Sequence, residues 1–511
     1  MLVKTYGSAT YGVNAQIITV EVNVDKGVGY QLVGMPDVAI KESAHRISAA
    51  LKNCGYKMPG KKITVNLAPA DLRKEGSAYD LPIAIGILAA SEQIKARNLD
   101  KYLMMGELSL DGSLQPVKGV LPIAIQAREE GFKGFFLPKQ NAKEAAIVND
   151  LEVYGIESMT QVIAFFDKGQ NLEPTVIDTR KEFFENINKF PFDFAEVKGQ
   201  ENVKRALEIA AAGGHNVLLI GPPGSGKTML AKRLPSILPP LTLSEALETT
   251  KIHSVAGKLG TESSLMTVRP FRSPHHTISG AALVGGGSYP QPGEISLSHN
   301  GVLFLDELPE FNRQVLEVMR QPLEDRVVTI SRARFSITYP SSFMLVASMN
   351  PSPSGYFPDD PKNTSSLTEM QRYMNKISGP LLDRIDIHIE VSPVPFEDLS
   401  DRRKGESSIS IRDRVVKARK IQTERFKDLK GIHYNAQMGA KELDTFCELD
   451  TSSKQLLKTA IERLNLSARA YDRILKVART IADLSDSENV KSEHIAEAIQ
   501  YRSLDREGWG M

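Results

Sequence analysis

The sequence contains very few cysteines, because Cys54 and Cys447 are the only two among 511 residues. Two thiols cannot form the disulfide framework of a small secreted protein, so we expect a reducing compartment. Long apolar runs are also absent, and the longest, residues 81–90, has about half of the ~20 residues that a membrane span needs. Residues 1–12 lack the apolar core of a secretory signal. These absences predict a cytoplasmic protein with no membrane partner.

An excess of charge of either sign is missing as well. Lys and Arg number 63 and Asp and Glu number 62, which gives a formal net charge of +1. Any attraction to nucleic acid must therefore come from local patches and not from the field of the whole molecule. At roughly 150 residues per domain, this length predicts about three domains, so a single small binding module is excluded.

The pattern of strands and helices divides the chain into three folded parts. The first part, residues 1–167, mixes short elements, with an expected strand at Ile17–Val24 and a hairpin at Leu108–Val117. The turn of this hairpin is Asp111-Gly112, a dipeptide that tolerates the positive φ angles of a type I′ turn. We predict a compact α+β domain here, followed by a polar linker at residues 168–193.

Two helices are expected in the same α+β domain. Val120–Glu130 has helical periodicity and stops at Gly131. Asn141 and Glu144 have the spacing of a capping box, which predicts a helix that begins after them.

The second and third parts differ in their strand content. Strand-like runs at residues 217–220, 302–305, 343–348 and 385–391 alternate with longer helical or loop stretches. This alternation is typical of a parallel sheet covered by helices, so we predict an α/β domain at 194–400. Residues 401–511 show helical periodicity and almost no strand signal. The fold class is therefore multidomain α/β with a helical C-terminal domain.

A phosphate-binding loop follows the first of these strands directly. It matches the P-loop pattern in full and leads into a helix, so we expect ATP with Mg²⁺ as the bound pair. Backbone N–H groups and the helix N-terminus cradle the phosphates, the lysine reaches the β and γ phosphates, and the threonine hydroxyl holds Mg²⁺. The loop consists of Gly221, Pro222, Pro223, Gly224, Ser225, Gly226, Lys227 and Thr228.

Acidic and amide side chains end the next two strands. Asp306 and Glu307 follow the strand at 302–305, at the sheet edge where open α/β sheets bind ligands. We expect Asp306 to contribute to the Mg²⁺ site and Glu307 to orient and deprotonate the attacking water. Asn350 is placed to hold that water or the γ phosphate, although an Asn before Pro351 also suits a plain turn.

Arg384 lies where the last predicted strand begins. It is a candidate arginine finger that reaches into the nucleotide site of another subunit. The alternative is a surface arginine that pairs with Asp383 or Asp386.

Two further motifs extend the pattern beyond the P-loop. They are RPFRSPHHT at 269–277 and GEISLSHNG at 293–301. Together with the P-loop, Asp306-Glu307, Asn350 and Arg384, these motifs resemble the magnesium chelatase-related AAA+ ATPases, and among them the competence protein ComM (YifB) family. The resemblance covers nearly the whole chain. It implies a homo-oligomeric ring, a hexamer, with a C-terminal helical lid, and it links the chain to branch migration of recombination intermediates in natural transformation.

The same resemblance implies a second sensor arginine in the lid. Arg469 is favoured by analogy, and Arg473 is its rival because residues at i and i+4 share one helix face. The neighbouring His275 and His276 have no third metal ligand at suitable spacing, so we expect hydrogen-bonding loop histidines.

The N-terminal domain resembles the Lon-type protease fold, notably in residues 74–81 and 106–112. That family needs a serine nucleophile activated by a lysine. Here Ala78 stands in the serine position, Ser77 lies one place early, and Leu121 stands in the lysine position. We therefore expect a scaffold or binding module without protease activity.

Many relatives carry cysteine pairs after the sensor asparagine, which resemble a structural zinc site. This chain has serines there, and a hydroxyl is a poor zinc ligand, so zinc is not expected. The serines are Ser352, Ser354 and Ser365.

DNA, branched or single-stranded and without sequence preference, is the expected partner. The alternative is a protein partner remodelled by a magnesium chelatase-like or protease-related ATPase. Residues 327–339, with Arg332 and Arg334, are predicted to form a hairpin that enters the pore of a ring, or a simple surface hairpin. A basic stretch between Arg402 and Lys430 either meets phosphates or forms a solvated helix face. Its basic residues are Arg402, Arg403, Lys404, Arg412, Arg414, Lys417, Arg419, Lys420, Arg425, Lys427 and Lys430, against Glu406, Asp413, Glu424 and Asp428.

Overall fold

A computed structural model describes residues 1–511 except 261–263, 288, 333–334, 401–404, 465 and 503–511. The chain forms two compact units. Among the described residues, none of the helices combines the length and the hydropathy that crossing a bilayer requires. The first unit contains Met1–Glu185, Leu243–Met266 and Pro290–Pro292, and the second contains Asn186–Thr242, Thr267–Tyr289 and Gly293–Met511.

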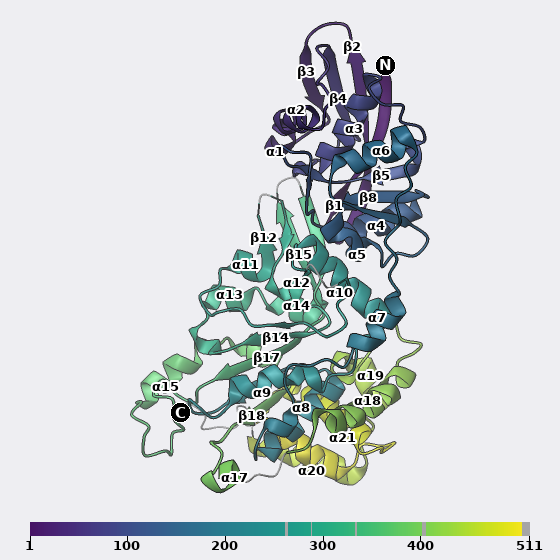
Figure 1. The fold of residues 1–511 in the computed structure, drawn as a ribbon. Coiled ribbons are helices and arrows are strands. Elements are labelled where there is room, and N and C mark those ends of the chain that lie inside the picture. Colours follow the sequence, from purple (N-terminus) through teal and green to yellow (C-terminus); the bar gives the residue numbers. More distant parts are fainter. Residues whose placement is uncertain (261–263, 288, 333–334, 401–404, 465, 503–511) are drawn as a thin grey trace. The chain divides into compact units, whose positions relative to one another are not determined.

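The first unit is built on a seven-stranded mixed sheet of order β3-β4-β2-β1-β5-β8-β9 (Figure 1). Alternation in β2 buries Ile18, Val20 and Val22 on one face, which confirms the strand predicted from its period of two. The strands are β1 (Leu2–Tyr11), β2 (Asn14–Asp25), β3 (Gly29–Val33), β4 (Lys62–Ala68), β5 (Tyr102–Met104), β8 (Gly134–Pro138) and β9 (Glu152–Ile156).

The predicted hairpin exists but its turn is different. β6 (Glu107–Leu108) and β7 (Leu114–Gln115) pair antiparallel, and only Gly112 of the expected turn dipeptide has a positive φ, of 86°. The Asp111 carboxylate instead accepts the Ser113 N–H at 2.9 Å. The connection is therefore longer than the predicted two-residue type I′ turn.

Helices cover the sheet of the first unit. The long apolar run of the sequence is α3 (Asp80–Ala90), which is buried on every side and so needs no polar face. The segment α10 (Leu243–Val255) also packs in this unit, although it follows the P-loop in the chain. The other helices are α1 (Val38–Lys41), α2 (Ser43–Asn53), α4 (Val120–Glu129), α5 (Ala142–Ala145), α6 (Met159–Lys168) and α7 (Thr179–Asn186).

The helix expected after Asn141 exists as α5, but the predicted capping box is wrong. The Asn141 side chain exchanges hydrogen bonds with the backbone of Val117, at 2.9 and 3.0 Å, and makes no capping bond to α5. Glu144 is buried instead, where its carboxylate accepts the N–H of Leu121 at 3.0 Å and the hydroxyl of Ser254. Tertiary partners therefore replace the local ones that the spacing indicated.

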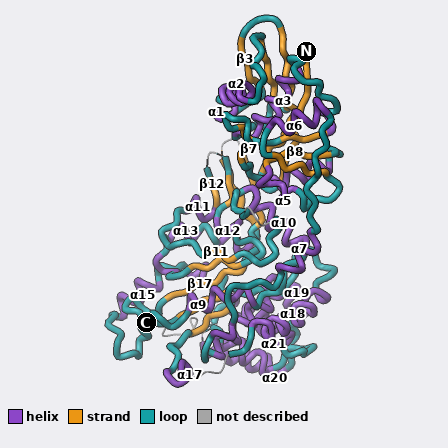
Figure 2. The backbone as a smooth tube through the Cα atoms, viewed as in Figure 1, coloured by secondary structure: helices purple, strands orange, loops and turns teal. Residues whose placement is uncertain are grey.

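The second unit is built on a five-stranded parallel sheet of order β11-β14-β17-β10-β18. This confirms the parallel sheet and the strand-like runs of the sequence, while the two-residue β11 was missed because it is too short to show a pattern. Figure 2 shows these strands in orange. They are β10 (Val217–Ile220), β11 (Phe271–Arg272), β14 (Val302–Leu305), β17 (Met344–Met349) and β18 (Ile387–Glu390).

Helices and one hairpin surround this parallel sheet. Side chains of α8, α18 and α21 share one buried apolar cluster with the sheet, so the C-terminal helices and the sheet have a common core. The hairpin is β15 (Val327–Arg332) with β16 (Phe335–Pro340), and β12 (Gly285–Gly286) and β13 (Gln291–Pro292) are short strands.

The helices of the second unit before residue 401 are α8 (Glu201–Gly213), α9 (Lys227–Arg233), α11 (Gly280–Val284), α12 (Glu294–Leu297), α13 (Arg313–Glu317), α14 (Arg320–Asp325), α15 (Leu367–Met374), α16 (Gly379–Leu382) and α17 (Phe396–Ser400). The C-terminal helices are α18 (Ser408–Arg425), α19 (Ala440–Phe446), α20 (Thr451–Leu464), α21 (Ala468–Leu484) and α22 (Ser492–Gln500).

Candidate functional site

The P-loop connects β10 to α9 and needs its glycines for conformation and space. Gly224 and Gly226 have φ angles of 78° and 92°, which side chains with a Cβ rarely adopt. A Cβ on Gly221 would lie 2.2 Å from the carbonyl oxygen of Val391. The loop therefore turns tightly enough for its backbone N–H groups to surround an anion.

The Lys227 ammonium folds back over this loop. Its Nζ donates to the carbonyl oxygens of Gly221 at 2.7 Å and Pro222 at 3.0 Å, and it lies 3.3 Å from Oδ1 of Asn350. Burial lowers the pKa of Lys227, and the carboxylates of Asp306 and Glu307 oppose this shift. Lys227 and Asn350 therefore meet over the P-loop.

Thr228 and Asp306 meet beside the lysine. The Thr228 Oγ1 donates to Oδ2 of Asp306 at 2.7 Å, and the Ser348 hydroxyl donates to the other carboxylate oxygen. Hydroxyl and carboxylate oxygens are the donors that Mg²⁺ prefers, so this pair fits the predicted metal. Ser348 holds Asp306 from β17 and was missed by sequence reasoning, because nothing in the sequence marks one serine within an apolar strand.

Glu307 follows Asp306 in a left-handed conformation, with a φ of 57°. Its side chain is 58% exposed, and its Oε2 lies 3.5 Å from Nδ1 of His276. The rings of His276 and His275 lie with their centroids 4.1 Å apart at an angle of 34°, and Nδ1 of His275 shares a hydrogen bond of 2.9 Å with the Thr277 hydroxyl. Both histidines are therefore loop residues with hydrogen-bond or ring partners, as expected, and one of them contacts the candidate base.

Gln200 supports the P-loop from the N-terminal side of α8. Its Nε2 donates to the carbonyl oxygen of Ser225 at 2.8 Å and to that of Ser392 at 3.1 Å. Gln200 itself has a φ of 58°, which aims the side chain across the start of the helix. Sequence reasoning missed this residue because its partners are 25 and 192 positions away.

Arg384 does not pair with Asp383 or Asp386, so that alternative is wrong. The residue is 9% exposed, and its guanidinium donates to the carbonyl oxygen of Pro380 and to the carboxylate of Glu324. The two aspartates have other partners, namely Arg469 and Arg473. Their proximity in sequence indicated a pairing that the fold does not make.

The two lid candidates differ in their surroundings. Arg469 is 67% exposed and donates to Asp383 at 2.6 Å, whereas Arg473 donates at 2.8 Å to the buried carboxylate of Asp386. Burial opposes the charge of Asp386, but Arg473 and a hydrogen bond from His215 outweigh it and hold the pKa of that carboxyl well below its usual range. Both arginines are therefore ion-paired, but the partner of Arg473 is buried, whereas Arg469 lies largely in solvent.

These arginines lie at the sheet edge opposite the P-loop. Val217 pairs with Ile387 and Ile220 with Glu390 in the parallel ladder. Arg384 precedes Ile387, whereas the P-loop begins after Ile220, so about 13 Å of strand separates the two ends at ~3.3 Å per residue. The structure therefore groups Lys227, Thr228, Asp306 and Asn350 at one edge and Arg384 with Arg469 at the other.

Part of the basic stretch is paired with carboxylates where the structure describes it. Arg414 pairs with Glu208 and Glu406, and Arg425 pairs with Asp483. Arg412 and Arg419 lie over the rings of Phe190 and Tyr434. On α18 itself, Lys417 and Lys420 are exposed, as are Asp413 and Glu424, which favours the solvated helix face. Arg402, Arg403 and Lys404 lie outside the described residues.

The predicted hairpin is confirmed as β15 and β16. Ile330 and Ile337 pair and are buried, whereas Ser331 and Ser336 pair on the exposed side. Arg332 is exposed near the turn, and Arg334 lies outside the described residues. One face of the hairpin is therefore apolar and packed, and the other is polar and available.

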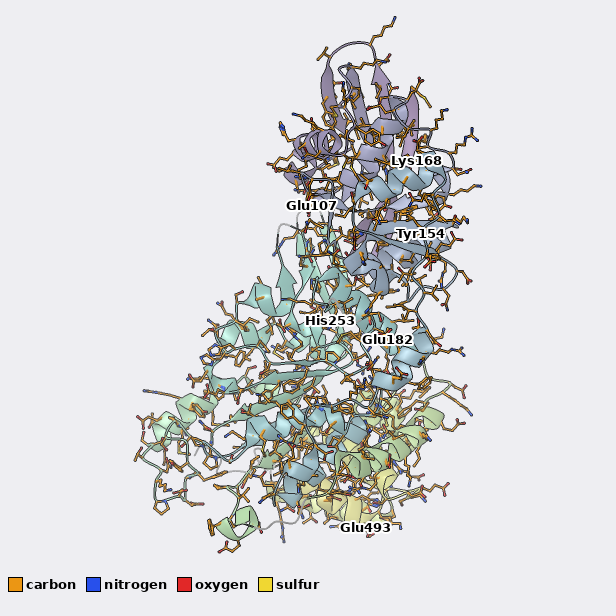
Figure 3. The ribbon with its side chains drawn as sticks, in the orientation of Figure 1. Glu107, Tyr154, Lys168, Glu182, His253 and Glu493 are labelled. Carbon is orange, nitrogen blue, oxygen red and sulfur yellow. The ribbon has the colours of Figure 1, made fainter. Side chains whose placement is uncertain are left out.

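The positions that resemble the Lon-type dyad have other partners. The Ser77 hydroxyl donates to the carboxylate of Glu107, which is labelled in Figure 3. Leu121 is fully buried, and its N–H donates to Glu144. Lys74 is buried too, and its Nζ donates to the carbonyl oxygen of Pro69.

The serines after Asn350 hold their own loop. The Ser352 and Ser354 hydroxyls share a hydrogen bond of 2.9 Å, and Ser354 also donates to Asn363 at 2.7 Å. The N–H of Ser354 donates to the hydroxyl of Ser365 at 3.0 Å. Hydrogen bonds thus close the loop in which a zinc site was not expected.

Comparisons with known proteins agree with this arrangement. Residues 193–399 match the family model described as magnesium chelatase, subunit ChlI. Residues 20–141 match the model for subunit ChlI of Mg-chelatase, and residues 405–502 match the model for the C-terminal part of that subunit.

Curated relatives extend the similarity to the full chain. Competence protein ComM of Haemophilus influenzae is 46% identical and covers 99% of this chain and 98% of its own length. The uncharacterized protein YifB of Escherichia coli is 45% identical over 98% of this chain and 96% of its own. The magnesium-chelatase 38 kDa subunit of Cereibacter sphaeroides is 28% identical over 32% of this chain and 54% of its own length. Similarity at this level over nearly every residue means that the chain belongs to the ComM (YifB) family of magnesium chelatase-related AAA+ ATPases.

Proposed function

We propose that this protein is a ring-forming ATPase, a hexamer, that hydrolyses ATP between subunits and uses the energy to translocate DNA. The observation that carries the proposal is the placement of Arg384 and Arg469 at the sheet edge opposite the P-loop of the same chain. Arginines at that edge serve catalysis only when the nucleotide of a neighbouring subunit faces them.

The P-loop and the polar side chains beside it each have a role in this proposal. Lys227 and the backbone of residues 221–226 bind the phosphates, and Thr228 with Asp306 would hold Mg²⁺. The metal ion, when bound with ATP, neutralises charge on the β and γ phosphates. Glu307 takes the proton of the attacking water, and Asn350 orients that water or the γ phosphate.

The arginines stabilise the negative charge that develops on the γ phosphate. Arg384 acts in trans as the finger, and Arg469 acts as the second sensor. Exposure distinguishes Arg469 from Arg473, because Arg473 already neutralises the buried Asp386.

DNA is the proposed substrate of the motor, branched or single-stranded and bound through its phosphates. The exposed polar face of the β15–β16 hairpin, with Arg332, is suited to line a ring pore. One relative is named a competence protein. On this basis we propose that the motor drives branch migration of recombination intermediates during natural transformation, and that it does so in the cytoplasm.

The remaining parts have supporting roles in this proposal. Residues 1–167 form a Lon-like scaffold or binding module that has no protease activity, and residues 168–193 form a linker. Residues 194–400 form the ATPase domain, which binds no zinc, and residues 401–511 form the lid. Remodelling of a protein partner is the second candidate function, and it is favoured by the mixed charge of the exposed α18 face.

One experiment separates the two candidates. ATP hydrolysis is measured alone, with a four-way DNA junction, and with an unfolded protein, and Lys227→Ala serves as the inactive control. We expect the junction to raise the rate severalfold and the strands to exchange only with ATP. Stimulation by the unfolded protein and not by the junction would favour the remodeller.

A further inference from the structure

The candidate finger Arg384 has a carboxylate partner on the element that leads into the hairpin. Its guanidinium donates to Glu324, the side chain of which is 59% exposed and lies in the last turn of α14. The Nε of Arg384 is buried and has no partner among the described residues. Arg384 is therefore held by an ion pair that leaves part of its hydrogen-bonding capacity unused.

Glu324 lies directly at the base of the hairpin. Arg326, two positions later, ends α14 with a φ of 58°, and its carbonyl oxygen accepts the N–H of Ser341 at 2.8 Å. Val327 and Pro340 then form the first pair of the β15–β16 ladder. A displacement of the last turn of α14 thus reaches both strands of the hairpin through backbone hydrogen bonds.

A carboxylate and a phosphate compete for one guanidinium. Both accept two parallel N–H bonds, and the geometry of the guanidinium suits either of them. A γ phosphate that arrives from a neighbouring subunit therefore meets an arginine that is already occupied by Glu324.

We propose that Glu324 is a positioning residue that couples the neighbour's nucleotide to the hairpin. Without a nearby γ phosphate, Glu324 holds Arg384 and the last turn of α14 together. When the neighbour binds ATP, Arg384 turns to the γ phosphate, Glu324 is released, and the hairpin is free to move. This inference rests on the proposed trans role of Arg384 and adds the link from that arginine to the substrate-facing element.

Glu324→Gln removes the competing charge and keeps the side-chain shape. Glu317→Gln is the matched control because it removes an ion pair to Arg320 at the start of the same helix, α14, without touching the contact between Glu324 and Arg384. In full-length rings, we expect Glu324→Gln to lower the ATP concentration for half-maximal hydrolysis at least threefold. Glu317→Gln should leave it unchanged. An unchanged or raised value for Glu324→Gln would overturn the proposal.

Hydrogen exchange of residues 320–332 gives a second measurement that does not depend on turnover. In the wild type, a non-hydrolysable ATP analogue should speed exchange there at least threefold. In Glu324→Gln, exchange should be fast without nucleotide and insensitive to the analogue, and Glu324→Asp should restore the response. A wild-type response in Glu324→Gln would contradict the coupling.

Arg384→Ala separates this inference from the proposed function. If Arg384→Ala keeps full hydrolysis, the finger role and the coupling are both wrong. If Arg384→Ala loses hydrolysis while Glu324→Gln matches Glu317→Gln in both measurements, only the coupling is wrong.

Discussion

The hydroxyl of Thr228 and the carboxylate of Asp306 share a hydrogen bond of 2.7 Å across 78 positions of sequence. It joins the first turn of α9 to the end of β14. Because Ser348 holds the other oxygen of Asp306, the carboxylate is oriented before any nucleotide arrives. The arrangement of these side chains therefore comes from the sheet itself.

Lys227→Ala and Glu307→Gln should fail at different steps. We expect Lys227→Ala to abolish ATP binding, because it removes the cation over the loop. Glu307→Gln should bind ATP normally but hydrolyse it about 10²–10⁴-fold more slowly, because the water loses its base. Titration with a fluorescent ATP analogue and phosphate release measure the two steps, with Lys232→Ala as the control. Equal loss of binding in both variants would contradict the role of Glu307.

Hydrolysis should recover when two inactive variants are mixed. A ring of Arg384→Ala and Lys227→Ala subunits contains interfaces at which an intact P-loop faces an intact Arg384. Phosphate release should therefore rise above that of either variant alone. The control mixes Arg384→Ala subunits with subunits that carry both Arg384→Ala and Lys227→Ala. No interface in such a ring contains an intact Arg384. No recovery at any ratio, in rings shown to exchange subunits, would count against a finger in trans.

DNA binding should depend on phosphates and be nearly independent of sequence. The described residues offer exposed lysines and a polar hairpin but no helix-turn-helix or zinc finger that could read bases, so log affinity should fall linearly with log salt. Lys417→Ala with Lys420→Ala should reduce the slope by about 1.8 if both contact duplex phosphates. Lys458→Ala, on α20, is the control.

The hairpin arginine should act on movement more than on affinity. We expect Arg332→Ala to uncouple ATP hydrolysis from strand exchange with a smaller loss of affinity, because it lies on the exposed hairpin face. Strand exchange on a four-way junction is compared with ATP consumed, and Thr329→Ala serves as the control. Normal exchange per ATP in Arg332→Ala would exclude this role.

Asp386→Asn should destabilise the second unit. Asp386 is buried and accepts hydrogen bonds from the partly buried Arg473 and the fully buried His215, so its neutralisation leaves both donors without their anion. Removal of one partner of a buried ion pair costs about 3–5 kcal/mol. Urea unfolding measures the change, and the exposed Asp428→Asn should stay within about 0.5 kcal/mol of the wild type. A similarly small change in Asp386→Asn would disprove this estimate.

The sequence by itself determined the parallel sheet, the P-loop motif and the grouping of Lys227, Asp306 and Asn350 at one edge of that sheet. These features are local: the loop conformation needs its glycines within eight positions, and the burial of β10 and β14 follows from short apolar runs. Parallel strands then bring their carboxyl ends to one edge, so Asp306 and Asn350 were predictable neighbours of Lys227.

Only the tertiary structure decided which partners the other side chains take. Arg384 pairs with Glu324 across 60 positions, Gln200 supports a loop 25 positions away, and Asn141 bonds Val117 instead of capping a helix. Spacing indicated nearer partners in two of these cases. A charged or amide group pairs with whichever partner the packed elements bring within hydrogen-bond distance, and that distance depends on sheet order and helix placement, which no local pattern encodes.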